Sequence, residues 1–557
     1  MLIFYKQQLG HLTNGVGSEK ESVMKKMIRS DLIKKGLFFF LGFSVSGGSY
    51  TFAAPPAVVR PHDFHEDLDW MEQQIENLGD TPEEISLRLN DLYRVIYAVQ
   101  FKQLEIRSIR LESGVLIQRI FQMRLRLSDQ LRQWWIDGKA TAAVVDAYRE
   151  VYRAGIYAED MIGELAAGLK RAGPRDRFLT PMEDIFPYLL RADKKRGGTV
   201  KFKGGDIIIE RGVRTNSAAI ARVGDGDAQY SHLVLIHEDA DGIIHPVEAL
   251  IEEGLVSYDL HHLLTQKVAR MSLFRARSEE VAQVLKLGAK IMYEKVLESQ
   301  RLGVPVPYNF GMQLTESMGT FCSNVARQAL AKGWQAQVEA KLRADAQYVP
   351  PPAPAIPTFP TRMRKLVETD FLRRVGVEIE ETFAPSDVQE EPLLRLFAEW
   401  RDFKRTAELR AKDMALTKVF EWMENEDYRL GESFLINSIG YVFIDSYSAP
   451  LWKWGLKTFV GFPIPPWMTR DQLQTMIMLE VTVKKLTDRL NKYAVAYEKI
   501  NGVPMHPELM KKHLELIRKA SNGRIGYLRP PDVAELMDRR RRETERNQSS
   551  PICYGLF

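Results

Sequence analysis

Cysteine is scarce in this chain of 557 residues, with Cys322 and Cys553 as the only two. A scaffold stabilised by several disulfides is therefore excluded. A zinc site built from cysteine pairs is excluded too, because no Cys-x-x-Cys occurs. A bond between the two cysteines would disable either as a nucleophile. We expect Cys322 to be a free thiol, and Cys553, in a short C-terminal tail, to be exposed and dispensable.

Strong net charge is also missing, since 77 basic and 73 acidic residues leave a formal charge of +4. Basic residues are spread among acidic ones, so the composition gives no support for a nucleic-acid partner. Without His-x-x-x-His, we interpret His237, His245 and the pair His261-His262 as surface or core residues. No metal and no cofactor is predicted. Gly-x-Ser-x-Gly and the P-loop motif are absent, which excludes those two chemistries.

The N-terminal residues 1–54 have the order of a secretory signal. A basic block is followed by the apolar run 37–45 and by Ala53-Ala54 ahead of Pro55-Pro56. The apolar run is shorter than the roughly 20 residues that span a bilayer. We predict an exported protein of the periplasm or cell envelope, with translation starting at Met24 or Met27. An uncleaved anchor or a buried helix stays an alternative.

Cys322 lies at the start of a predicted helix, Ser323 to Ala346. Thr320 is a plausible N-cap, which would put Cys322 in the first turn. Unpaired N–H groups and the helix dipole favour a thiolate at that position. The alternative is a small buried apolar residue, which is what free cysteine usually is.

A hairpin upstream supplies a histidine and a carboxylate. The strand Tyr230 to Ile236 carries His232, and the return strand Ile243 to Leu250 carries Glu248. A tight loop at Asp241-Gly242 would place Glu248 opposite Leu235. A loop centred on Ala240 would place it opposite His232, where it would orient the imidazole. The sequence leaves both registers open.

Four short motifs together resemble a known family. They are Lys203-Gly204-Gly205-Asp206-Ile207-Ile208-Ile209, Tyr230-Ser231-His232-Leu233-Val234-Leu235-Ile236, Glu248-Ala249 and Phe321-Cys322-Ser323-Asn324-Val325. Their order resembles the circularly permuted papain-like cysteine hydrolases of the NlpC superfamily, especially the YiiX-like branch. The likeness covers about residues 201–330.

This resemblance implies a small antiparallel sheet and a catalytic helix for that part of the chain. The large flanking regions lie outside the resemblance and are predicted to be all-α, so the predicted fold class is α+β. It makes Cys322 the nucleophile, His232 the general base and Glu248 the orienting acid. Asn324 departs from the family, which often carries an acidic residue there, but that position is not catalytic.

The regions around these motifs are predicted to be mainly helical. Thr81-Pro82-Glu83-Glu84 and Thr469-Arg470-Asp471-Gln472 both read as capping boxes. The predicted organisation is a signal peptide (1–54), an N-terminal helical region (55–175), the catalytic domain (176–347), a Pro-rich linker (348–362), a C-terminal helical region (363–530) and a basic tail (531–557).

An aromatic stretch from Leu451 to Met468 contains Trp452, Trp454 and Trp467 among lysines and prolines. Such composition suits a membrane interface or an apolar substrate groove. A loop whose rings fill the domain core is the alternative.

Together these patterns predict an exported cysteine hydrolase of the amidase or peptidase type. Its substrate would be a cell-wall peptide or an acylated envelope component. Two alternatives stay open: a non-catalytic helical scaffold with a degenerate papain-like module, and an acyltransferase that forms the same thioester.

The order of basic, apolar and small residues in positions 24–54 predicts that the mature chain begins near Ala54 or Pro55. Mass spectrometry of the N-terminus of exported protein measures this directly. Recovery of intact Met1 or Met24 in the soluble fraction would contradict the export prediction.

Overall fold

The computed structural model describes most of the chain after residue 63. The described residues are 64–98, 106–167, 188–193, 200–215, 218–219, 222, 229–314, 319–354, 359–360, 374–376, 381–431 and 469–533. The predicted signal peptide, the aromatic stretch with Trp452, Trp454 and Trp467, Cys553 and nearly all of the basic tail lie outside these residues. The predictions about them stay predictions.

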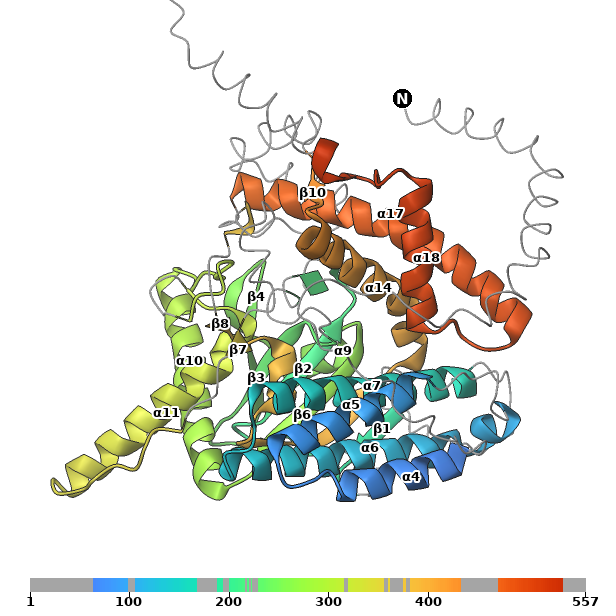
Figure 1. The fold of residues 1–557 in the computed structure, drawn as a ribbon. Coiled ribbons are helices and arrows are strands. Elements are labelled where there is room, and N and C mark those ends of the chain that lie inside the picture. Colours follow the sequence, from blue (N-terminus) through green and yellow to red (C-terminus); the bar gives the residue numbers. More distant parts are fainter. Residues whose placement is uncertain are drawn as a thin grey trace, which may run out of the picture. The chain divides into compact units, whose positions relative to one another are not determined.

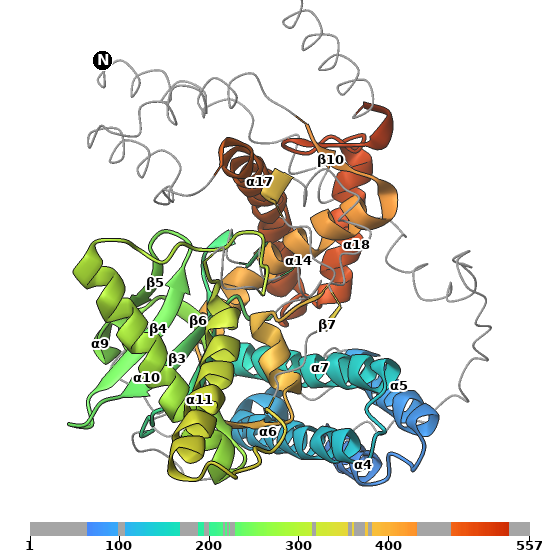
Figure 2. The ribbon, with the colours of Figure 1, turned by 90° about the vertical axis from the view of Figure 1, so that its left-hand side faces the viewer.

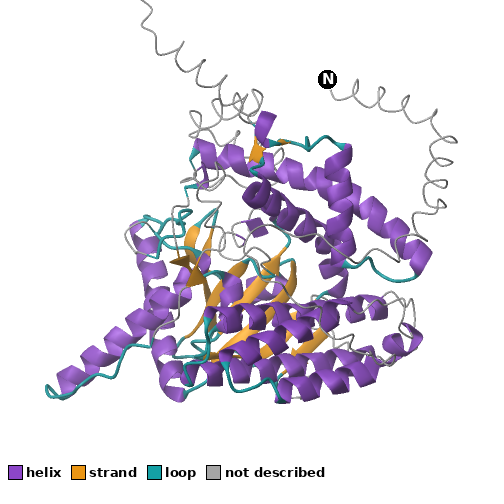
Figure 3. Cartoon of the chain, viewed as in Figure 1, coloured by secondary structure: helices purple, strands orange, loops and turns teal. Residues whose placement is uncertain are grey.

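A seven-stranded antiparallel sheet forms the centre of the described fold (Figure 1 and Figure 3). Its strands are β1 (Tyr188–Arg191), β2 (Ile207–Gly212), β3 (His232–Glu238), β4 (Ile244–Leu250), β5 (Gly254–Ser257), β6 (Val268–Ala276) and β9 (Leu394–Arg401), in the order β1-β9-β6-β2-β3-β4-β5. Two shorter pairs join β7 (Phe359–Pro360) to β8 (Glu381–Thr382), and β10 (Arg429–Leu430) to β11 (Leu528–Arg529). The predicted α+β class is confirmed.

The sheet includes a strand from outside the segment that carries the four motifs. Strand β9 follows the Pro-rich segment and pairs with both β6 and β1. The region 363–530, predicted to be helical, therefore also completes the sheet.

Both faces of the central strands are buried, which explains their uninterrupted apolar sequences. On one face Ile209 and Leu235 belong to the large core that includes the helices. On the other face Ile208, Val234 and Trp400 form a second cluster with the short helix α9 (Leu260–Thr265).

The N-terminal helices are α4 (Phe64–Glu76), α5 (Pro82–Ala98), α6 (Ile106–Ile136) and α7 (Ala142–Ala167). They pack on one another (Figure 1), and α6 also contacts β9. The predicted capping box of α5 is confirmed, because the N–H of Glu84 donates to Thr81 Oγ1 at 3.2 Å. The N–H of Thr81 donates in return to Glu84 Oε2 at 3.3 Å. Pro82, at the first helical position, has no N–H that would lack a partner within the helix.

A buried network of charges joins α6 and α7 to the sheet. Its members are Arg124, Glu159, Asp160, Arg270, Glu399 and Arg401. Arg124 Nε lies 2.9 Å from Glu159 Oε1, and its Nη2 lies 3.1 Å from Glu399 Oε1. Burial would raise the pKa of Glu399, but the surrounding guanidinium groups lower it to about 2. The network thus keeps the Glu399 carboxylate ionised inside the core.

Helices α10 (Glu279–Leu302) and α11 (Cys322–Ala344) lie side by side and both contact β3 (Figure 1 and Figure 2). Glycines allow their backbones to approach closely. A Cβ atom on Gly288 would lie 1.8 Å from the carbonyl oxygen of Ala329, and one on Gly333 would lie 2.0 Å from that of Val284. This crossing fixes the position of α11 and of the cysteine at its start.

The C-terminal helices are α14 (Phe403–Glu426), α17 (Arg470–Asn501) and α18 (Pro507–Ala520), and α14 contacts α7. A short 3-10 helix, η3 (Pro385–Glu390), precedes β9. The capping box of α17 at Thr469 and Gln472 is confirmed. The apolar stripe of α17 is buried as far as Leu490, but Tyr493 is 44% exposed because the helix continues beyond the core. No helix among the described residues is long and apolar enough to cross a membrane.

Replacing Gly333 with alanine is expected to destabilise the protein by about 1–3 kcal/mol, the usual cost of overpacking. At an unhindered helical site the same change would stabilise by up to about 1 kcal/mol, because alanine favours helix. Urea unfolding measures the difference, with the exposed Gln335→Ala in the same helix as control. A Gly333→Ala protein as stable as wild type would contradict the close crossing.

Candidate active site

The structure brings Cys322, His232 and Glu248 together. Cys322 is the first residue of α11, His232 is the first residue of β3, and Glu248 lies within β4. His232 Nε2 and Glu248 Oε2 are 2.6 Å apart. The Cys322 side chain is close enough to raise the pKa of the same imidazole. Since Nε2 is engaged with the carboxylate, Nδ1 is the ring nitrogen left for the thiol.

The hairpin has neither of the two registers considered above. Glu248 lies opposite Val234, and the turn is centred on Asp241, with the N–H of Asp239 donating to the carbonyl of Ile243 at 3.0 Å. His232 and Glu248 are therefore diagonal neighbours across β3 and β4. The turn is longer than a two-residue loop, and this length sets the register. Asp239 Oδ1 stabilises the turn by accepting hydrogen bonds from the N–H groups of Asp241 and Ile243.

The predicted N-cap of the cysteine helix is wrong. Phe321 occupies the cap, with extended φ and ψ and no side-chain cap hydrogen bond. Thr320 instead uses its Oγ1 to accept a hydrogen bond from Gln328 Nε2 at 3.3 Å. Cys322 still lies in the first turn, where backbone N–H groups have no partner within the helix.

Several contacts hold the start of α11 in place. The hydroxyl of Ser323 donates to the carbonyl of Phe383. The N–H of Asn309 donates to the carbonyl of Thr320 at 2.9 Å. Since these partners come from segments before and after the helix, the position of Cys322 depends on tertiary packing.

The pKa of His232 is strongly shifted. Burial would lower its pKa, but hydrogen bonds with Cys322 and Glu248, and the negative charges of those groups, raise the pKa well above the usual value. Glu248 is fully buried, so its attraction for the imidazolium is little screened. The arrangement favours a protonated imidazole held between a carboxylate and a sulfur.

Two residues at the site were missed by reasoning from sequence. Tyr308 is buried beside Cys322, and burial, assisted by Cys322, raises the pKa of its phenol well above the usual value. Tyr308 reaches the site through a parallel bridge to Thr320, a pairing without a periodic sequence signal. The second residue is Glu210, at the end of an Ile-Ile-Ile run, directly opposite His232 on β2. The sequence signal that could have revealed Glu210 is an acidic residue at the end of an apolar, buried strand.

Two of the other histidines considered above have an aromatic partner of their own. The rings of His237 and His245 stack on Tyr293, at centroid distances of 4.8 and 4.6 Å. In the part of the chain that the structure describes, no set of three or more His, Cys, Asp or Glu side chains is arranged to hold a metal ion.

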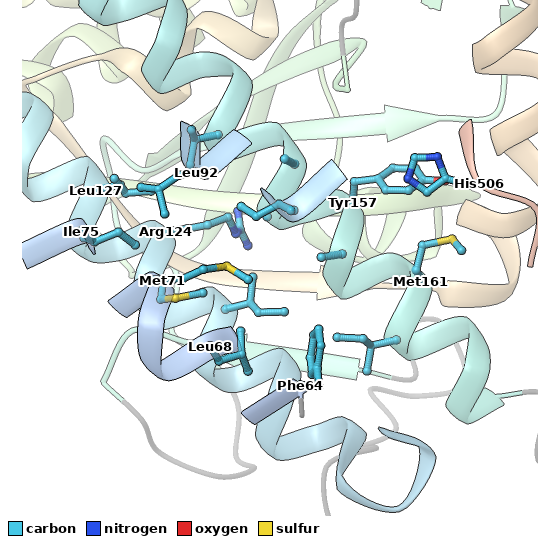
Figure 4. Close-up of a pocket in the computed structure, with 18 residues that line it drawn as sticks. Phe64, Leu68, Met71, Ile75, Leu92, Arg124, Leu127, Tyr157, Met161 and His506 are labelled. Carbon is cyan, nitrogen blue, oxygen red and sulfur yellow. The ribbon is translucent and has the colours of Figure 1, made fainter. Parts of the chain in front are cut away.

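An apolar cavity lies elsewhere, among α4, α6 and α7 (Figure 4). Leu68, Met71 and Leu127 line it, with Tyr157 and His506 at one end. Arg124 also lines the cavity, but its guanidinium is already paired with Glu159 and Glu399. The cavity offers no nucleophile, so the chemistry points to Cys322 instead.

Compared with models of protein families, with curated proteins and with solved structures, the chain shows no significant match.

The raised pKa of His232 predicts a specific response to substitution. In Glu248→Ala and in Cys322→Ala the pKa should fall, because burial would still oppose the imidazolium while one stabilising partner is lost. NMR titration of the His232 ring in wild type and in both variants measures this. His513, whose pKa is lowered by burial, provides an internal control because neither substitution touches it.

The same shift affects stability. Because the pKa of His232 is higher in the folded protein than in the unfolded one, the stability that His232 contributes is fully present below the unfolded pKa. That stability is lost as pH rises through the folded pKa.

A His232 pKa that is unchanged in both variants would contradict the arrangement described here.

Proposed function

We propose that this protein is an exported cysteine hydrolase that cleaves an amide or acyl bond in a cell-envelope substrate. The observation that carries the proposal is the His232 imidazole, which lies between the Glu248 carboxylate and the Cys322 thiol at the start of a helix. Thiol nucleophiles are activated by this combination of a neighbouring base and a helix N-terminus.

In the first half of the reaction the sulfur of Cys322 attacks the substrate carbonyl carbon. Its proton is already on His232, as the imidazolium of the resting pair, and the carbonyl oxygen becomes an oxyanion. We assign the stabilisation of that charge to the backbone N–H of Cys322 and the Tyr308 hydroxyl. His232 then protonates the leaving amine or alcohol, and the acyl group stays on sulfur as a thioester.

In the second half a water molecule gives a proton to His232 and attacks the thioester. When the new tetrahedral intermediate collapses, the carboxylic acid leaves and the sulfur of Cys322 is again paired with protonated His232. Glu248 remains ionised throughout, since its role is to orient the imidazole and stabilise the imidazolium. The cycle needs no group beyond water and these side chains.

The chain order of the three residues supports a permuted papain-like arrangement for this part of the fold. The histidine and acid strands β3 and β4 precede the cysteine helix α11, and α11 packs against both strands. The resemblance of residues 201–330 to the NlpC superfamily rests on the same residues.

The envelope location comes from the N-terminal charge pattern, and the substrate class follows from it. A cell-wall peptide or an acylated envelope component offers the amide or ester carbonyl that a thiol hydrolase needs. Trp452, Trp454 and Trp467 are proposed to contact the membrane interface or an apolar part of the substrate.

Alkylation of Cys322 tests the proposal. In a Cys553→Ser background, iodoacetamide should modify Cys322 between pH 5 and 7, where an ordinary thiol with a pKa of about 8.5 is mostly protonated. His232→Ala should move the labelling curve to alkaline pH and reduce turnover by about 10²–10⁴-fold. Glu248→Gln should cost less than Glu248→Ala, since the amide can still accept from one ring nitrogen.

Cys322→Ser in the same background is the matched control and should show no labelling. Incubation of wild-type protein with envelope extracts, followed by mass spectrometry, should reveal an acyl adduct on Cys322 and free acid product. Product transferred to an acceptor other than water would indicate an acyltransferase. Labelling that ignores both His232 and Glu248 substitutions would favour the scaffold alternative.

A further inference from the structure

His232 has a carboxyl group on each neighbouring strand. Glu210 lies directly opposite it on β2, and Glu248 lies diagonally from it on β4. The mechanism above uses only Glu248. Glu210 is 1% exposed, so its carboxyl group has little water to solvate a charge.

The Glu210 carboxyl group has few partners. Its Oε1 and the Oε1 of Glu248 are both buried and accept no hydrogen bond from the described residues. The charged groups that act on it are His232 from β3 and Glu248 from β4. On its other side β6 presents Met271, which contributes no charge.

Charge balance determines which of the two acids is ionised. One imidazolium can neutralise one carboxylate, and Glu248 already forms the 2.6 Å pair with it. A second carboxylate would leave a net negative charge in a buried place, next to a sulfur that must itself become negative. In agreement, burial, assisted by the charge of Glu248 and opposed by His232, raises the pKa of Glu210 to about 8.

We propose that Glu210 is a positioning residue that keeps its proton at neutral pH, so that Glu248 alone holds the imidazole. The inference rests on the proposed function, because the imidazole must give up its proton in each cycle. Ionised Glu210 would hold that proton on His232, and His232 could then no longer take one from water. Hydrolysis of the thioester would slow on the alkaline side as Glu210 loses its proton.

Glu210→Gln tests the proposal, since the amide copies the neutral acid in shape and never ionises. At pH 7 the variant should hydrolyse the acyl adduct on Cys322 within about twofold of wild type. Between pH 7 and 9 the wild-type rate of adduct loss should fall severalfold, whereas the Glu210→Gln rate should not. Glu339→Gln, an exposed acid on α11, is the matched control and should behave as wild type.

Unfolding measurements detect the Glu210 proton without any chemistry at Cys322. Because the folded pKa exceeds the unfolded one, wild type should lose stability relative to Glu210→Gln as pH rises from about 4.5 to about 8. The difference should then level off. Infrared spectra of Glu391→Gln protein carrying ¹³C-labelled glutamate give the same information should Glu210→Gln not fold, as the band of a buried protonated carboxyl group should disappear near pH 8. The substitution at Glu391 removes a second buried glutamate whose pKa is raised to about 8.

The two proposals fail in different ways. A flat stability difference, or no protonated carboxyl band at pH 7, would overturn the assignment of Glu210 even if Cys322 is reactive. An alkaline loss of rate that persists in Glu210→Gln would overturn its positioning role. If Cys322 forms no adduct while the stability difference appears as expected, the proposed function fails, and with it the positioning role, although the buried proton stands.

Discussion

The sheet and the N-terminal helices meet through charges buried in the core. Arg124 on α6, Glu159 and Asp160 on α7, and Arg270, Glu399 and Arg401 on the sheet carry three positive and three negative charges. Each ion costs several kcal/mol to remove from water, and removal of one member leaves another uncompensated, at a cost of about 3–5 kcal/mol. The network therefore fixes how α6 and α7 lie against β6 and β9.

The candidate site follows from that fixed sheet. Strand β6 pairs with β2, β2 with β3 and β3 with β4, so a single register places Glu210, His232 and Glu248 next to one another. Helix α11 is placed separately, by its close crossing with α10 at Gly288 and Gly333. The site thus depends on two independent packing arrangements that meet at the start of β3.

The buried ion network and the candidate site balance their charges in different ways. The ion network balances its charges with three guanidinium groups, whose positive charge is permanent. The site has one imidazole for two carboxyl groups and a thiol, so protons must make up the balance. A cluster that exchanges protons near neutral pH suits acid–base chemistry, whereas one that does not suits a structural role.

Local patterns in the sequence determined the features that rest on neighbouring residues. The capping boxes at Thr81 and Thr469 and the helix that begins beside Cys322 depend on contacts within a few positions, and they were predictable. The hairpin turn, the addition of β9 to the sheet, the approach of Tyr308 and the pairing of Glu210 with His232 were decided by tertiary structure. These features join residues from 6 positions apart, at Glu238 and Ile244 in the hairpin, to 213 apart, at Tyr188 and Arg401, and no local periodicity encodes such pairing. Each depends on which buried surfaces and charges the whole fold can satisfy together.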